Sequence, residues 1–145
     1  VSGGAGHRPW QPREGRKPSR QGSALDPGGG KKAVCAMAMG PQTLIIKKGE
    51  HGALLFQETK MFYCPALPLE EVFDPTGAGD TFVGGFIGYL AQTNDISFEN
   101  MRKAIVYGSA MASFCVEKFG TERLFEVTAS DLEARVGEFK ELARF

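Results

Sequence analysis

The sequence predicts an incomplete α/β fold, because three short strand patterns are followed by helical patterns over the rest of the chain. Aliphatic and β-branched residues fill segments 43–46 and 53–56, and the turn-like residues 48–52 separate them. A third strand is expected over residues 61–64, before an extended stretch, residues 65–68, whose prolines disfavour the helical conformation. Strands followed by helices are typical of an α/β layer, but three strands are too few for a complete sheet.

One helix is expected before these strands in the sequence, and another is expected after them. The first ends within residues 31–39, where Gly40-Pro41 forms a stop signal. The second follows residues 74–80, and its apolar residues recur with a helical period. They form a single face made by Phe82, Phe86, Tyr89 and Leu90. Because glycine lowers helix propensity, Gly84, Gly85 and Gly88 indicate that another backbone approaches this helix closely.

Two further helices are expected in the last third of the chain. One begins after Ser97, a residue suited to an N-cap, and runs to about Lys118, before the stop residue Gly120. Its small central residues, 108–113, predict tight packing. The other covers residues 131–143, after Thr128 and Ser130 as candidate caps. Its predicted buried side consists of Leu132, Val136, Phe139 and Leu142.

Residues 1–32 differ in composition from the remainder of the chain. They carry seven Lys or Arg and two acidic residues, together with eight of the 19 glycines and four of the eight prolines. Such a segment cannot bury a core of its own, so we expect it to be disordered or not to be native coding sequence. A basic tail that binds nucleic acid is an alternative. Residues 33–145, the predicted folded domain, carry ten basic and fifteen acidic residues, which does not favour a nucleic-acid surface.

The cysteines and the hydropathy pattern predict a cytoplasmic protein without a membrane partner. Cys35, Cys64 and Cys115 are widely spaced and include no C-x-x-C pair, so free thiols fit better than a disulfide framework or a zinc site. No apolar run reaches the roughly 18–20 residues that span a membrane. The N-terminus lacks the apolar region of a signal peptide.

Residues 74–80, D-P-T-G-A-G-D, carry the most informative chemistry of the sequence. Gly77 and Gly79 let the backbone approach a ligand closely, and the amides of Ala78, Gly79 and Asp80 at a helix N-terminus attract an anion. Asp80 is placed to accept the proton of an alcohol, and Asp74 suits a cation or its water shell. An anion cradle beside a general base indicates phosphoryl transfer to a hydroxyl group. A glycine-rich turn capped by Asp74 is the purely structural alternative.

The heptad, followed by Gly84-Gly85-Phe86-Ile87, resembles the second signature of the ribokinase-like (PfkB) carbohydrate kinases. Segment 43–56, TLIIKKGEHGALLF, is similar to the strand and nucleotide loop that precede this signature, and residues 107–120 are similar to the family's small-residue helix and following loop. The resemblance covers roughly residues 33–145. It implies the C-terminal part of a three-layer ribokinase-like fold, with the N-terminal half of the sheet and the lid missing.

The resemblance implies ATP-dependent transfer of the γ-phosphoryl group to a hydroxymethyl group of a sugar or nucleoside. Asp80 corresponds to the catalytic base of the family. Its anion hole corresponds to Gly77, Ala78 and Gly79. The positions implied for nucleotide binding are Lys47, Lys48, Gly49, Gly52, Ser109 and Gly120. The family often has Thr-x-Gly at residues 47–49, so here a cation is expected to replace a hydroxyl contact.

The same resemblance implies the cations and partners of the site. Asp74 and Thr76 fall where the family builds a monovalent-cation site, completed by carbonyls near Cys115, Lys118 and Gly120. Magnesium is expected with ATP, potassium is the candidate monovalent cation, and a homodimer is the candidate assembly of a full-length parent. A truncated, catalytically inactive fragment that binds a nucleotide is the alternative function.

Overall fold

The computed structural model describes residues 29–144, and the chain divides into two compact units, residues 1–42 and 43–145. The described part of the first unit contains helix α1 (Gly29–Ala38), which confirms the helix expected to end within residues 31–39. Gly40 follows this helix with a φ of 131°, a conformation that glycine adopts without a steric penalty. We predicted that residues 1–32 are disordered or not native coding sequence. Of these, residues 1–28 lie outside the part of the chain that the structure describes.

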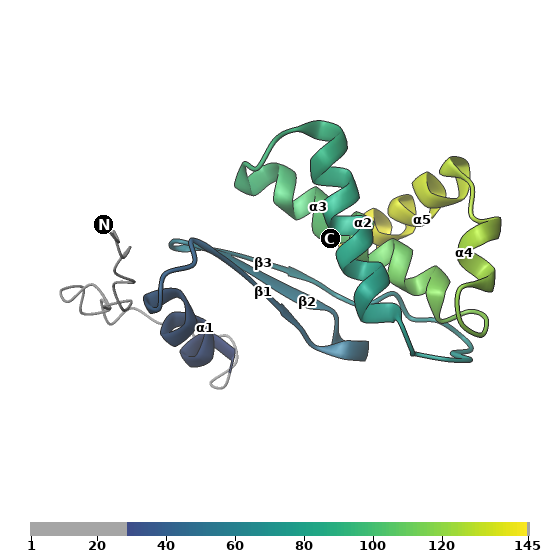
Figure 1. The fold of residues 1–145 in the computed structure, drawn as a ribbon, viewed down its shortest axis with the longest axis horizontal. Coiled ribbons are helices and arrows are strands. Elements are labelled where there is room, and N and C mark those ends of the chain that lie inside the picture. The colour runs from purple at the N-terminus through teal and green to yellow at the C-terminus, as the bar shows by residue number, and fades with distance from the viewer. Residues whose placement is uncertain (1–28, 145) are drawn as a thin grey trace, which may run out of the picture. The chain divides into compact units, whose positions relative to one another are not determined.

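The second unit begins with three antiparallel strands in the order β1-β2-β3 (Figure 1). Strands β1 (Thr43–Lys47), β2 (Ala53–Gln57) and β3 (Lys60–Cys64) confirm all three sequence predictions, each to within one residue. Lys47 pairs with Ala53, and Ala53 pairs in turn with Cys64. The predicted turn between the first two strands is a short 3-10 helix, η1 (Gly49–His51).

Four helices follow the sheet: α2 (Ala78–Thr93), α3 (Phe98–Cys115), α4 (Glu122–Glu126) and α5 (Ala129–Leu142). Ser97 caps α3 by accepting a hydrogen bond from the Asn100 amide at 3.3 Å, as predicted. Thr128 and Asp131 form a reciprocal capping box at the start of α5. The expected end of α3 was wrong by three residues, because the helix ends at Cys115 and not at Lys118. Helix α4 was not foreseen.

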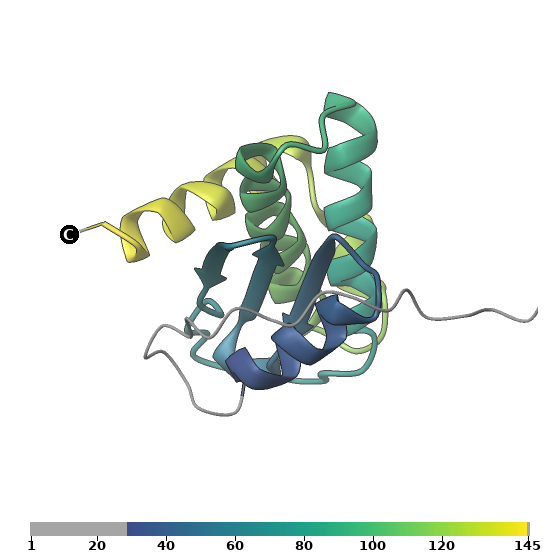
Figure 2. The same ribbon diagram turned by 90° about the vertical axis from the view of Figure 1, so that its left-hand side faces the viewer.

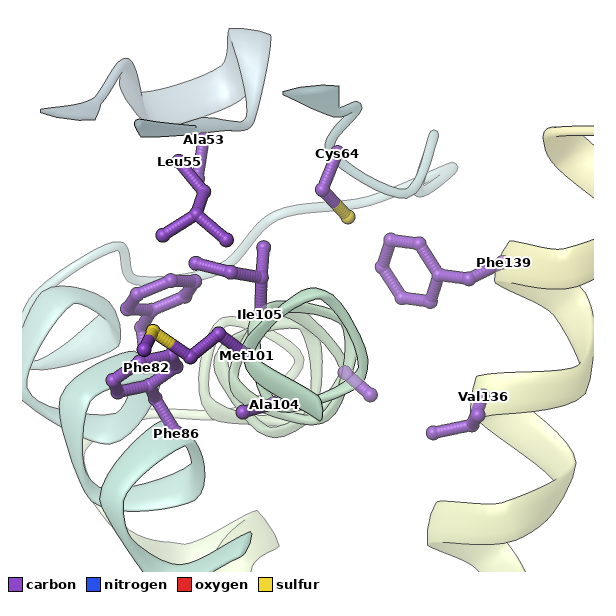
Figure 3. Packing of buried hydrophobic residues seen from close by; sticks show 11 residues of the cluster. Ala53, Leu55, Cys64, Phe82, Phe86, Met101, Ala104, Ile105, Val136 and Phe139 are labelled. Atoms are coloured by element: carbon purple, nitrogen blue, oxygen red, sulfur yellow. The ribbon is translucent and has the colours of Figure 1, made fainter. Parts of the chain in front are cut away.

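The core of the second unit lies where α3 meets the sheet, α2 and α5. Figure 3 shows α3 between the other two helices, with Phe82 and Phe86 of α2 on one side and Val136 and Phe139 of α5 on the other. The inward residue Leu55 of the sheet is fully buried. The predicted apolar faces are therefore correct for α2 and for most of α5. Leu142 is the exception, because its side chain is 45% exposed at the end of α5.

Helices α2 and α3 run side by side on the same side of the sheet (Figures 1 and 2). A glycine of each helix lies at this contact: a Cβ on Gly85 would lie 3.1 Å from the Cα of Gly108. The close approach expected at three glycines of α2 is thus correct for Gly85 and wrong for Gly84 and Gly88, which face open space. Gly108 and Ala110 of the small-residue segment are buried, as predicted.

The Gly108→Ala variant is expected to lower the free energy of unfolding by about 1–3 kcal/mol. A Cβ at this position would lie 2.7 Å from the main-chain oxygen of Phe82, so the two helices would have to separate. The matched Gly88→Ala variant is expected to stabilise the protein by about 0.5–1 kcal/mol, because alanine costs less backbone entropy in an exposed helix. Urea unfolding of both variants checks these signs, and an unchanged midpoint for Gly108→Ala would contradict the tight packing of α2 on α3.

Among the described residues, no helix is long and apolar enough to cross a membrane. Residues 29–144 also contain no group of three or more His, Cys, Asp or Glu side chains arranged to hold a metal ion. Cys35, Cys64 and Cys115 are free cysteines, as predicted, with Cys64 and Cys115 buried.

Candidate active site

The loop before α2 turns sharply at Gly77, which has the left-handed φ of 82° and is the N-cap of the helix. The Ala78 amide donates to the Pro75 carbonyl at 3.2 Å, and the Thr81 amide donates to the Gly77 carbonyl at 2.9 Å. Between them, the amides of Gly79 and Asp80 have no hydrogen-bond acceptor within residues 29–144. Two unpaired amides at the positive end of a 16-residue helix form an anion-binding turn.

Asp80 lies in this first turn of α2, and its side chain is exposed. The same turn therefore carries the two free amides, which attract negative charge, and a carboxylate, which accepts a proton. An anionic group bound at the amides would lie next to a hydrogen-bond acceptor for an approaching hydroxyl group. This is the combination that phosphoryl transfer to an alcohol requires.

Asp74 begins the loop and is held by hydrogen bonds to its carboxylate. Its Oδ1 accepts a hydrogen bond from the Thr76 amide at 2.9 Å. Hydrogen bonds from the Thr76 side chain and amide, with a smaller contribution from the Gly120 amide, lower the pKa of Asp74 below its ordinary value. The Asp74 carboxylate is therefore ionised at neutral pH.

Two carbonyl oxygens of different loops, those of Thr76 and Gly120, converge on the Cys115 side chain. The Cys115 Sγ lies 3.7 Å from the Thr76 carbonyl oxygen and 3.9 Å from the Gly120 carbonyl oxygen, and its single S–H can donate to either of them. The Phe73 amide donates to the Val116 carbonyl at 2.9 Å and so ties the two loops together. Carbonyl oxygens beside an ionised carboxylate suit a hard cation, because such cations prefer oxygen ligands.

A pocket of about 760 Å³ lies between the sheet, the start of α2 and the second half of α3. Six of the residues predicted from sequence to form the site line it: Lys47, Gly49, Gly52, Ala78, Gly79 and Ser109. The other six predicted residues do not line it: Lys48, Asp74, Thr76, Gly77, Asp80 and Gly120. Of these, Gly77 and Asp80 lie in the turn that borders the pocket, and Lys48 follows Lys47 at the end of β1.

Gly52 and Lys48 close the turn between β1 and β2 beside this pocket. The Lys48 amide donates to the Gly52 carbonyl at 2.8 Å, and the Gly52 amide donates to the Gly49 carbonyl at 3.0 Å. The Tyr63 hydroxyl donates to the His51 carbonyl at 2.7 Å from the neighbouring strand. These bonds fix the turn, so that its glycines present backbone to the pocket.

Ser109 joins the pocket to the buried end of β3. The Cys64 thiol donates to the Ser109 hydroxyl at 3.7 Å. Burial raises the pKa of the Cys64 thiol, and the hydrogen bond to Ser109 opposes this only in part. Cys64 is thus a neutral donor that orients the Ser109 side chain rather than a reactive thiolate.

One wall of the pocket was missed by the reasoning from sequence. The extended segment after β3 supplies mainly apolar side chains, namely Ala66, Leu67, Pro68, Leu69 and Val72. The prolines that predicted an extended chain were the only sequence signal for it. An apolar wall facing a polar glycine turn suits a ligand with a flat apolar group and a charged group.

A partly buried polar network also borders the pocket, which Ser113 lines, and was not foreseen. The Arg135 guanidinium donates to the Ser113 hydroxyl at 2.9 Å and to the Glu117 carboxylate at 2.7 Å. It also lies over the Phe114 ring, 4.0 Å from the centroid. Arginine stacked on a ring and paired with a carboxylate is a stable arrangement, so this network holds α5 against the end of α3.

Comparison with known proteins relates this site to a family. The sequence profile of the pfkB family carbohydrate kinases matches residues 25–127, more than half of the chain. A nucleoside kinase of Thermoplasma acidophilum is 34% identical over 100 residues, which are 69% of this chain and 32% of the relative. Ribokinase of Bacillus subtilis is 36% identical over 87 residues, which are 60% of this chain and 28% of the relative.

Solved structures agree with this result. Aminoimidazole riboside kinase from Salmonella enterica, complexed with aminoimidazole riboside and an ATP analog, has a TM-score of 0.62 and 30% identity, over 74% of this chain and 35% of that chain. Nucleoside kinase from Methanocaldococcus jannaschii has a TM-score of 0.57 and 31% identity, over 67% of this chain and 30% of that chain. The chain thus spans about a third or less of these relatives' length, and its sheet and helices form part of the ribokinase-like fold. The chain belongs to the pfkB carbohydrate kinase family.

Proposed function

We propose that this chain is the phosphoryl-transfer segment of a kinase that moves the γ-phosphoryl group of ATP to a hydroxymethyl group of a sugar or nucleoside. One observation carries the proposal: the unpaired amides of Gly79 and Asp80 lie in a helical turn that borders a large pocket, beside the Asp80 carboxylate. Membership of a carbohydrate kinase family supports the same reaction class.

In the proposed reaction, the hydroxymethyl oxygen attacks the γ-phosphorus while its proton passes to the Asp80 carboxylate. The bond between the γ-phosphorus and the bridging oxygen breaks, and ADP leaves with the electron pair. The turn formed by Gly77, Ala78 and Gly79 serves as the anion hole for the charge on the phosphoryl oxygens. The Ala78 amide already donates to Pro75, so the amides of Gly79 and Asp80 are the donors available for this role.

The 760 Å³ pocket is the proposed ATP site. Its apolar wall, made by Ala66, Leu67, Pro68, Leu69 and Val72, suits the adenine ring. The turn with Lys47, Lys48, Gly49 and Gly52 suits the sugar and phosphates. Ser109 contributes a hydroxyl group from the side of α3, and Gly120 lies in the loop beyond that helix. The kinase from Salmonella enterica that shares this fold was solved with an ATP analog, which supports ATP as the nucleotide.

Two cations are proposed for the site. Magnesium would enter with the nucleotide, held mainly by the phosphates, and would neutralise their charge. Asp74 and Thr76, with the Gly120 carbonyl, would hold a monovalent cation such as potassium, and the convergence of the Thr76 and Gly120 carbonyls on Cys115 fits such an ion. Its role would be to keep the loop before α2 in the shape that exposes the Gly79 and Asp80 amides.

The acceptor class is proposed from the relatives, which are named as kinases of nucleosides, ribose and aminoimidazole riboside. A homodimer is the assembly we propose for a full-length parent. A second candidate function is supported by length: because the chain spans only a third or less of its relatives, it fits an inactive segment that binds the nucleotide alone.

A coupled assay of ADP release, with the purified chain, magnesium and ATP, separates these two functions. Ribose, fructose, aminoimidazole riboside and a set of nucleosides serve as acceptors, with potassium or sodium as the monovalent salt. Acceptor-dependent ADP release that is faster in potassium is expected for the kinase. ATP binding without release supports the nucleotide-binding segment, and the absence of both contradicts the proposed function.

A further inference from the structure

A second pocket, of about 560 Å³, is lined by the first half of α3 together with residues of β3, α2 and α5. It shares no lining residue with the 760 Å³ pocket, although α3 contributes to both: side chains from residues 99–107 line the second pocket, and side chains from residues 109–113 line the first. We propose that this second pocket binds a small aromatic anion, an apolar ring that carries a phosphate or carboxylate group. The proposal is independent of the function proposed for the first pocket.

The apolar part of this lining is rich in aromatic rings. Tyr89 of α2 and Tyr107 of α3 stack, with 4.3 Å between their ring centroids. Phe139 and Val136 are buried, and Figure 3 shows both extending from α5 toward α3. Phe62 lines the pocket from β3. Because aromatic rings pack favourably on other rings, these side chains suit a flat apolar group.

The Tyr107 hydroxyl group has a partner on α5. It donates a hydrogen bond to the Glu133 Oε1 at 2.5 Å. Burial, together with this hydrogen bond and the negative charge of Glu133, raises the pKa of Tyr107 to about 12. The hydroxyl group therefore stays protonated at neutral pH and keeps donating to Glu133. This contact ties α3 to α5 and holds the Tyr107 ring in place at the pocket.

Cationic side chains outnumber acidic ones in the lining. Among the described residues, Glu99 is the only carboxylate that lines the pocket, whereas Arg102, Lys103 and Lys140 are cationic. The Arg102 guanidinium donates to both Glu99 oxygens, at 3.0 Å each, and lies 4.9 Å from the centroid of the Phe62 ring. Lys103 and Lys140 form no ion pair within residues 29–144. One positive charge on α3 and one on α5 are thus left without a counter-charge in this part of the chain.

The acidic residues of α3 and α5 do not neutralise these two lysines. Each of them already has another partner: Glu99 with Arg102, Asp131 with Thr128, Glu133 with Tyr107, Glu138 with Arg135 and Glu141 with Arg144. An anion bound in the pocket would supply the missing negative charge and gain attraction from both ammonium groups. A pocket of this size, with aromatic walls and few charged groups, is typical of a small-molecule site.

Calorimetric titration of the 145-residue chain at low ionic strength tests the proposal, with naphthyl phosphate and neutral naphthol as the probes. Both lysines are exposed. Lys103→Met and Lys140→Met are therefore each expected to weaken naphthyl phosphate binding about 2–5-fold, the contribution of an exposed ion pair, and the double variant about 4–25-fold. Naphthol binding should not change. The matched control is Lys60→Met, which removes the same charge from an exposed position outside both pockets.

A second measurement locates the bound probe. In NMR spectra of the methyl-labelled chain, naphthyl phosphate is expected to shift the methyl signals of Val106 and Val136, which line this pocket. The signal of Ala112, which lines the first pocket, should stay in place. Saturating magnesium-ATP should not displace the probe, because the two pockets have no lining residue in common.

Several results would overturn this inference. They are the absence of naphthyl phosphate binding, displacement of the probe by ATP, a shift at Ala112 in place of the two valines, and binding that the double lysine variant leaves unchanged. An equal loss of affinity in Lys60→Met would also overturn it, because the net charge of the chain would then explain the effect. Absence of ATP binding would contradict the proposed function and leave this inference standing.

Discussion

An Asp80→Asn variant is expected to transfer the phosphoryl group about 10²–10⁴-fold more slowly, the usual contribution of a general base. Asparagine has nearly the same shape as aspartate but cannot accept the hydroxyl proton. The Asp80 side chain is exposed in the first turn of α2, so the exchange should not disturb the packing of the helix. The amides of the anion-binding turn also stay in place, and ATP binding should change little.

The measurement compares kcat with the ATP affinity of the same variant, in whichever form of the protein shows acceptor-dependent turnover. Glu70→Gln is the matched control, since it removes an exposed carboxylate from the loop outside the pocket lining. The control should keep the turnover of the unchanged protein. Turnover retained by Asp80→Asn would exclude Asp80 as the general base.

The secondary structure was predictable because its signals are local. The strands follow from runs of aliphatic and β-branched residues between turn signals, and the apolar face of α2 follows from the helical period. The caps Ser97 and Thr128 follow from single side chains. Helix α4 was missed because five residues hold too little periodicity to be recognised. Which glycine of α2 contacts α3 was also not predictable, since Gly84 and Gly85 differ only in the direction that they face.

Only the part of the candidate site that a single segment of the chain forms could be predicted from the sequence. Residues 74–80 indicated an anion-binding turn with a carboxylate, and the structure shows the two unpaired amides in it. The contact of Lys47 with Gly79, the apolar wall and the network around Arg135 join segments far apart in the sequence. Such contacts depend on how α2, α3 and α5 pack on the sheet, and no local pattern encodes that packing.

Position 52, which the sequence assigned to ligand binding, also requires glycine for structural reasons. It follows η1 with a φ of 88° and a ψ of −148°, a conformation that is essentially restricted to glycine. A Cβ at this position would overlap the Cys64 carbonyl oxygen and lie 2.7 Å from the carbonyl carbon of Pro65. Both groups are backbone at the end of β3, where no side-chain rotation can relieve the contact.

A Gly52→Ala variant is therefore expected to lose about 3 kcal/mol or more of unfolding free energy, from backbone strain and overpacking together. Gly49→Ala is the matched control in the same turn, because Gly49 has a φ of 57° but nothing within 4 Å of its Cβ position. It should lose only about 1–2 kcal/mol, the cost of the left-handed conformation for alanine. Urea unfolding of both variants measures the difference. Equal losses would mean that the backbone conformation alone requires glycine at position 52, whereas the larger loss at Gly52 would assign the excess to the contact of position 52 with the backbone at the end of β3.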